Sequence, residues 1–175
     1  MRCLLFLRNL LIMRRVQTAS EGKLLFTLES LNDTKLLGKR ISECVVPGLT
    51  LLLEGQLGAG KTTLVREICR ELGWKRTCSP SFSLVNEYAR ARIPVAHADL
   101  YRVENADARD FGLDDYLDDG WLLIVEWPER LERADFSEVW HCLFKNHGNG
   151  TRTFSVRAAG VSARNALARL EKISE

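Results

Sequence analysis

One glycine-rich stretch constrains this chain more than any other feature. It satisfies the spacing G-x-x-x-x-G-K-[ST] and consists of Gly55, Gln56, Leu57, Gly58, Ala59, Gly60, Lys61 and Thr62, with Thr63 directly after it. The apolar run before it, residues 49–53, predicts a buried strand, and the pattern that begins near Lys61 predicts a helix. A strand, this loop and a helix in that order form the setting in which the spacing makes a phosphate-binding P-loop.

The residue types in the loop suit a triphosphate ligand. Glycines let several backbone N–H groups converge on phosphate oxygens, and the following helix directs its positive end at the same point. We expect Lys61 to reach the β- and γ-phosphates and the Thr62 hydroxyl to bind Mg²⁺. Residues 55–63 are therefore the predicted phosphate-binding set. The alternative, a glycine-rich surface turn without a ligand, does not explain the flanking strand and helix.

Two carboxylates end predicted strands. Asp99 closes the strand 93–99, and Glu126 follows the strongly apolar run 121–125. Carboxylates at the C-terminal ends of strands face the ligand crevice of an open α/β sheet, where they bind Mg²⁺ or polarise an attacking water. We predict Thr62, Asp99 and Glu126 as the metal-binding set, and Glu126, Asp99 and Lys61 as the catalytic set. The alternative for each carboxylate is a strand-end cap or a salt-bridge partner.

Two further polar features lie between the loop and Glu126. Ser81 and Ser83 precede a predicted strand, in the segment where P-loop proteins commonly place hydroxyls that meet the γ-phosphate. We predict that both bind nucleotide, and the alternative is an ordinary turn. His97 has no partner at metal-ligand spacing, so it is interpreted as a structural residue or one that supports the site.

The remaining pattern predicts one α/β domain over 21–175. Strands are expected at 23–28, 138–144 and 153–156, the last two as a terminal hairpin around the turn 147–150. Helices are expected over 161–173 and after Ser30, which offers a helix cap with the acidic residue Asp33 three positions on. The predicted architecture is a P-loop NTPase three-layer fold, with a central mixed, largely parallel sheet flanked by helices. An acidic stretch over 104–119 is expected to be a solvated helix and loop.

The net charge of +2 hides an asymmetry. Residues 1–20 contain four arginines and no acidic residue, so the rest of the chain carries 21 basic and 23 acidic residues, a net charge of −2. This balance argues against a basic nucleic-acid platform. The segment 1–20 is expected to be a poorly ordered basic extension; a transit peptide, a membrane-surface helix and sequence upstream of a later start at Met13 stay open. The five scattered cysteines indicate reduced packing residues in a cytoplasmic protein.

Four blocks together resemble the TsaE (formerly YjeE) family of small P-loop ATPases. They are GQLGAGKTT at 55–63, SPSFSLVNEY at 79–88, HADLYR at 97–102 and VEWPER at 125–130. The resemblance spans about 23–133. It implies that residues 61 and 62 bind phosphates and Mg²⁺, that Asp99 and Glu126 are the acidic residues of the ATP–Mg²⁺ site, and that 81–83 form a switch-like loop. Gln56 departs from the family, which often has Asp there.

The resemblance also implies a function and partners. The family supports threonylcarbamoyl modification of adenosine 37 in tRNAs that read ANN codons, by hydrolysing ATP to drive or reset a complex of TsaD and TsaB. ATP and Mg²⁺ are the implied cofactors, contact with tRNA is indirect, and no stable membrane association is expected. Two alternatives stay open: a small-molecule kinase that shares the P-loop, and a nucleotide-gated adaptor in which hydrolysis is not essential.

Overall fold

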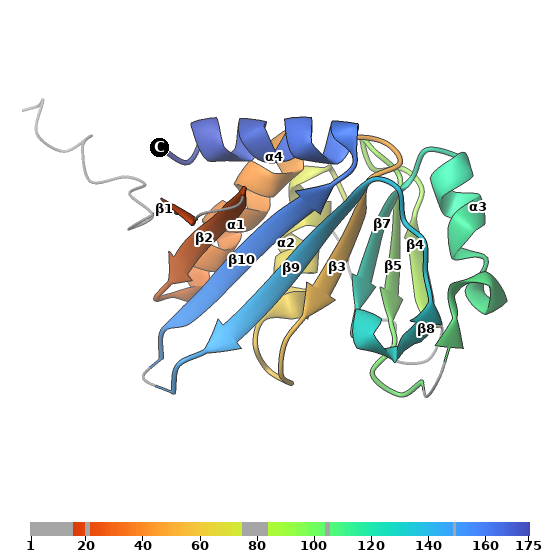
Figure 1. Cartoon of the computed structure of the whole chain (residues 1–175), viewed down its shortest axis with the longest axis horizontal. Coiled ribbons are helices and arrows are strands. Elements are labelled where there is room, and N and C mark those ends of the chain that lie inside the picture. Colours follow the sequence, from red (N-terminus) through yellow and green to blue (C-terminus); the bar gives the residue numbers. More distant parts are fainter. Residues whose placement is uncertain (1–15, 20–21, 75–83, 104–105, 149) are drawn as a thin grey trace, which may run out of the picture.

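The computed structural model describes residues 16–19, 22–74, 84–103, 106–148 and 150–175, and its centre is an eight-stranded sheet (Figure 1). The strand order is β1-β2-β10-β9-β3-β7-β5-β4. The strands are β1 (Val16–Ala19), β2 (Lys23–Leu28), β10 (Arg152–Ala159), β9 (Val139–Asn146), β3 (Thr50–Glu54), β7 (Leu122–Glu126), β5 (Val95–Asp99) and β4 (Val85–Tyr88). Strand β1 thus belongs to the segment assigned from sequence to the basic extension.

Parallel pairing is confined to the four central strands. β3 pairs in parallel with β7 on one side and β9 on the other, and β5 pairs in parallel with β7. The outer strands β4, β10, β2 and β1 are antiparallel to their neighbours. The unbroken apolar run of β3 fits its central place, because a strand covered on both faces needs apolar side chains on both. The mixed α/β sheet predicted from sequence is confirmed, but it is only partly parallel, because the β9–β10 hairpin and the strands β1, β2 and β4 add antiparallel pairs at both edges.

Helices α1 (Leu31–Cys44) and α2 (Lys61–Glu71) pack together on one face of the sheet (Figure 1). The predicted cap of α1 forms: Ser30 accepts from the backbone of Asp33, and the Asp33 carboxylate accepts from the backbone of Ser30. The two helices approach closely at Gly38, where an added Cβ would lie 2.7 Å from the Cβ of Glu67. This approach sets α2, and with it the loop at its N-terminus, against the sheet.

The hairpin β9–β10 and α4 (Val161–Lys172) close the same side of the domain. Phe154 is fully buried, and its ring centroid lies 5.0 Å from that of Phe144 and 6.1 Å from that of Phe26. The Glu138 carboxylate accepts hydrogen bonds from the backbone N–H groups of Val161 and Ala163, which caps α4. The terminal hairpin and closing helix predicted from sequence are therefore present.

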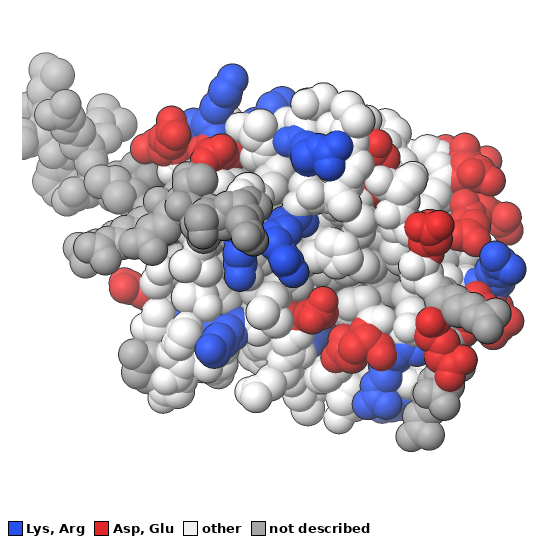
Figure 2. All heavy atoms as spheres, in the orientation of Figure 1, with Lys and Arg blue, Asp and Glu red and all other residues white. Residues whose placement is uncertain are grey.

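The opposite face is covered at its β4 end by α3 (Leu113–Asp118) and the single-turn helix η1 (Ala108–Phe111). A two-stranded parallel sheet of β6 (Ala106–Asp107) and β8 (Leu131–Arg133) lies beside them, and the short helix η2 (Pro128–Arg130) leads into β8. Acidic side chains gather over this region (Figure 2). The exposed ones are Asp110, Asp114, Asp115, Asp118 and Asp119, which agrees with the predicted solvated helix and loop.

Three of the cysteines are free and buried, as expected for packing residues. Burial raises the pKa of Cys44 to about 11 and that of Cys69 to about 12, and it raises the pKa of Cys142 as well. These thiols are therefore protonated and unreactive at neutral pH. Within the described residues, no helix has both the length and the apolar character that a membrane crossing requires.

Candidate functional site

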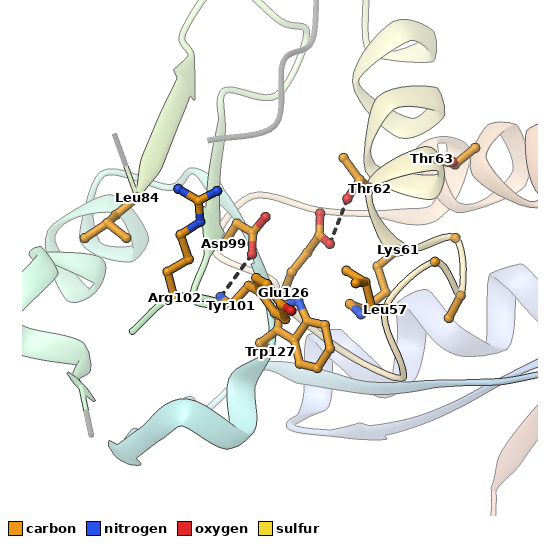
Figure 3. Close-up of a pocket in the computed structure, with 13 residues that line it drawn as sticks. Leu57, Lys61, Thr62, Thr63, Leu84, Asp99, Tyr101, Arg102, Glu126 and Trp127 are labelled. Carbon is orange, nitrogen blue, oxygen red and sulfur yellow. Dashed lines mark hydrogen bonds between the residues drawn. The ribbon is translucent and has the colours of Figure 1, made fainter. Parts of the chain in front are cut away.

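A cavity of about 320 Å³ opens at the C-terminal ends of β3, β7 and β5 (Figure 3). One wall is the P-loop and the first turn of α2, from Leu57 to Thr63. The other wall carries Asp99 and Glu126 together with Tyr101, Arg102 and Trp127. This is the position at which open α/β sheets bind ligands, because loops from neighbouring strands meet there.

The backbone of the P-loop requires glycine at its two ends. Gly55 has φ 140°, and a Cβ there would lie 2.8 Å from the carbonyl oxygen of Phe144. Gly60 has φ 112° and occupies the N-cap of α2 without a capping side chain. The first N–H groups of α2 therefore receive no side-chain acceptor from their own N-cap, and the helix directs its positive end toward the cavity.

Lys61 is buried beneath the loop and folded back on it. Its Nζ donates to the carbonyl oxygens of Gly55 at 2.6 Å and Gln56 at 3.2 Å, and lies 3.7 Å from the ring centroid of Trp127. Burial lowers the pKa of Lys61, while the negative charges of Glu126, Glu129 and Asp99 act in the opposite direction. The cation is thus held beneath the loop by neutral groups that a stronger anionic ligand can replace.

Glu126 connects the two walls of the site. Thr62 Oγ1 donates to its Oε2 at 2.9 Å (Figure 3), and His97 Nε2 lies 2.9 Å from its Oε1. The carboxylate is 2% exposed, yet it lines the cavity. A buried carboxylate that is bonded on both oxygens has a fixed orientation, and here it is fixed next to the hydroxyl predicted to bind Mg²⁺.

Asp99 lies beside Glu126, because the two residues are register partners across β5 and β7. Its Oδ1 accepts from the backbone N–H of Tyr101 at 3.1 Å (Figure 3). Trp127 directly follows Glu126 in the left-handed conformation, with φ 61° and ψ 49°, and its ring lies 5.0 Å from that of Tyr101. A non-glycine residue in this conformation is strained, and such strain is concentrated at functional sites.

The structure brings most of the predicted residues together. Lys61, Thr62, Asp99 and Glu126 all line one cavity, with the loop residues 57–60 and Thr63. Gly55 and Gln56 do not line it, and their carbonyls hold Lys61 instead. Ser81 and Ser83 lie outside the described residues.

No role was predicted from sequence for Tyr101 and Trp127, which both line the cavity. Tyr101 lies two residues after Asp99, and Trp127 directly follows Glu126. Arg102 also lines the cavity, whereas Arg130 does not.

The polar groups of the cavity are suited to a metal ion that is coordinated by the protein and by a ligand together. Among the described residues, no cluster of three or more His, Cys, Asp or Glu side chains could hold a metal ion alone. One hydroxyl and two carboxylates on neighbouring strands are instead the donor set with which Mg²⁺ is held between a protein and phosphate oxygens.

Comparison with known proteins indicates the family of this chain. The family model described as "Threonylcarbamoyl adenosine biosynthesis protein TsaE" matches residues 28–154. The chain is 35% identical over 129 residues to a protein of Bacillus subtilis (strain 168) named "tRNA threonylcarbamoyladenosine biosynthesis protein TsaE", covering 73% of this chain and 81% of that one. It is 39% identical over 111 residues to the protein of the same name from Aquifex aeolicus (strain VF5), covering 62% and 79%.

A solved structure has a similar fold. The crystal structure of Bacillus subtilis YdiB superposes with a TM-score of 0.72 at 27% identity, covering 93% of this chain and 99% of that one. The matched family region, 28–154, contains both walls of the cavity. This chain belongs to the TsaE family.

Proposed function

We propose that the protein binds and hydrolyses ATP with Mg²⁺ in the biosynthesis of tRNA threonylcarbamoyladenosine, together with TsaD and TsaB. One observation carries the chemical part: the P-loop hydroxyl of Thr62 is hydrogen-bonded to Glu126, with Asp99 as the register partner of that carboxylate. The names of the relatives support the biological part.

The roles of the residues follow from their chemistry. Lys61 would leave the carbonyls of Gly55 and Gln56 for the β- and γ-phosphates, because a cation binds a polyanion more strongly than a neutral carbonyl. Thr62, Asp99 and Glu126 would hold Mg²⁺, which when bound neutralises charge on the phosphates. Glu126 or Asp99 would accept hydrogen bonds from the attacking water and so orient it.

A second cavity adjoins the first. It measures about 350 Å³ and shares Gly58, Gly60 and Thr63 with the first cavity. Leu31, an exposed apolar side chain, and Arg152 lie in its wall. We propose that the base and ribose lie here, because an exposed leucine suits the face of a base and the phosphates would then run across the loop between the two cavities.

Hydrolysis is expected to be slow in the isolated chain. Arg102 is the arginine that lines the cavity, and no hydrogen bond from its guanidinium to another described residue holds it toward the P-loop. Fast phosphoryl transfer needs a positioned cation against the developing charge. We therefore propose that TsaD or TsaB accelerates turnover by ordering this side of the site. A cytoplasmic location is part of the same proposal.

The test is a pair of substitutions measured for both ATP affinity and phosphate release. Lys61→Ala should weaken ATP–Mg²⁺ binding by about 100-fold or more, the scale of losing one preorganised charge-stabilising donor. Glu126→Gln should keep most of the binding and lose most of the turnover. Full hydrolysis by Lys61→Ala would refute the assignment of the site.

The same variants test the biological role in a reconstituted modification reaction with TsaD, TsaB and tRNA. Both should fail to support repeated rounds of threonylcarbamoyladenosine formation. Normal modification by Glu126→Gln, with hydrolysis lost and binding kept, would instead indicate a nucleotide-gated adaptor. Transfer of phosphate to a nucleoside or sugar, in place of release to water, would indicate a kinase.

A further inference from the structure

We propose that His97 is a positioning residue for the ATPase reaction, which holds the Glu126 carboxylate in the orientation that the reaction requires. The inference rests on the proposed function and adds a residue that has no contact with the cavity. It starts from the buried pair formed by His97 Nε2 and Glu126 Oε1, 2.9 Å apart with side chains 1% and 2% exposed.

The bond has one direction. A carboxylate only accepts hydrogen bonds, so His97 Nε2 is the donor. The other ring nitrogen, Nδ1, is buried and has no hydrogen-bond partner among the described residues. A ring that donates from Nε2 and leaves Nδ1 as a lone-pair nitrogen avoids a buried N–H without an acceptor. Among the described residues, the imidazole therefore forms a hydrogen bond with Glu126 alone.

The sheet makes this contact rigid. His97 lies on β5 and Glu126 ends β7, and the register pairs His97 with Ile124 and Asp99 with Glu126. His97 and Asp99 thus approach the same carboxylate region from one strand, at positions two residues apart. The ring of Tyr88 packs 6.5 Å from the imidazole, centroid to centroid, on the neighbouring strand β4. An imidazole held in this way limits the rotation of the glutamate.

The geometry explains why Glu126 needs such a partner. With only the bond from Thr62 to Oε2, the carboxylate would turn freely once Thr62 is drawn to Mg²⁺. The bond to Oε1 does not involve the cavity, so it persists when a ligand binds. His97 would thereby keep Oε2 directed at the metal and water side of the site. Outer partners that orient metal-binding carboxylates in this way typically change metal affinity or activity by about 10- to 100-fold.

A matched pair of substitutions tests the proposal. His97→Gln and His97→Met have nearly the same shape, but only glutamine keeps a donor at the position of Nε2. We expect His97→Met to lower kcat by about 10- to 100-fold and to raise the Mg²⁺ concentration needed for half-maximal ATP binding, whereas His97→Gln should recover most of both losses. Affinity for ATP without Mg²⁺ should stay the same in both, and thermal unfolding should show that both are folded.

A double substitution separates positioning from packing. In a Glu126→Gln background, His97→Met should cause no further loss of kcat, because the group that His97 orients is already disabled. Equal activity of the Gln and Met variants at equal stability, or an undiminished loss in the Glu126→Gln background, would overturn the proposal. If the wild-type protein binds ATP–Mg²⁺ without hydrolysing it, the proposed ATPase activity fails, and the Mg²⁺ dependence still decides the role of His97.

Discussion

The polar groups at the two ends of the sheet are satisfied in different ways. At the β9–β10 end, Glu138 bonds to two backbone N–H groups of α4, and the indole N–H of Trp140 donates to the carbonyl oxygen of Ala163. In the cavity, the hydrogen bonds of Lys61 within the described part of the chain go to neutral carbonyls, and its ammonium group faces an aromatic ring. The first arrangement is complete within the protein. In the proposed function the second is completed by ATP–Mg²⁺, so stability and function should respond to different residues.

The largest expected effect comes from removing a buried ring of the aromatic core. Phe154→Ala should lower the free energy of unfolding by about 3 to 5 kcal/mol, because it removes a fully buried ring that packs between Phe26 and Phe144. Denaturant unfolding measures the change. Leu143→Ala on the adjacent strand, where the side chain is 42% exposed, is the control and should stay within about 0.5 kcal/mol. A loss below about 1 kcal/mol for Phe154→Ala would show that the β9–β10 end of the sheet does not depend on this core for its stability.

A smaller effect tests the cap of α4. Glu138→Ala should cost about 1 to 2 kcal/mol, because two backbone N–H groups lose their acceptor. Glu138→Gln keeps one acceptor oxygen and should lose about half as much. Amide hydrogen exchange in the first turn of α4 would locate the change, and Glu132→Ala, at an exposed site, is the control. Equal stability of the Ala and Gln variants would mean that the carboxylate does not act as a cap.

Local sequence signals predicted much of the fold. Strand β2 has the predicted bounds, and the capping box at Ser30 formed as the pattern indicated. The P-loop and the two strand-end carboxylates were found because each obeys a local rule: a fixed spacing, or a charge at the end of an apolar run. Such rules need no knowledge of which strands are neighbours. The nucleotide roles of Ser81 and Ser83 stay predictions, since those residues lie outside the described part of the chain.

The contacts that define the site could not be predicted in this way. His97 and Glu126 are 29 residues apart in the chain, and their bond depends on the register of β5 against β7. The same is true of the contact between Lys61 and Trp127, because the left-handed turn after β7 places the ring. Strand β1 was also missed, because its pairing with β2 is a property of the sheet edge. All three contacts depend on how distant parts of the chain are placed in the folded sheet, which a single sequence does not reveal.

The smallest predicted effect is at Lys61, where a substitution in the site should leave the free energy of unfolding unchanged or raise it. Lys61→Met should leave the free energy of unfolding unchanged or raise it by up to about 1 kcal/mol without nucleotide, because a polar residue kept for a ligand is commonly replaced at no cost in stability. Burial lowers the pKa of Lys61, so the unfolded chain binds a proton there more readily than the folded protein. The unfavourable contribution of the charge is therefore present below the lowered pKa and fades as the pH rises toward the ordinary value of 10.5.

Thermal and denaturant unfolding of both proteins from pH 7 to 10.5 would measure this difference. Any advantage of Lys61→Met should shrink with rising pH and disappear when ATP–Mg²⁺ is added, because only the wild-type protein gains stability from the ligand. A loss of more than about 1 kcal/mol in the Met variant at pH 7 would mean that Lys61 stabilises the ligand-free fold. The loop would then be as internally complete as the cap of α4, and the contrast between the two ends of the sheet would fail.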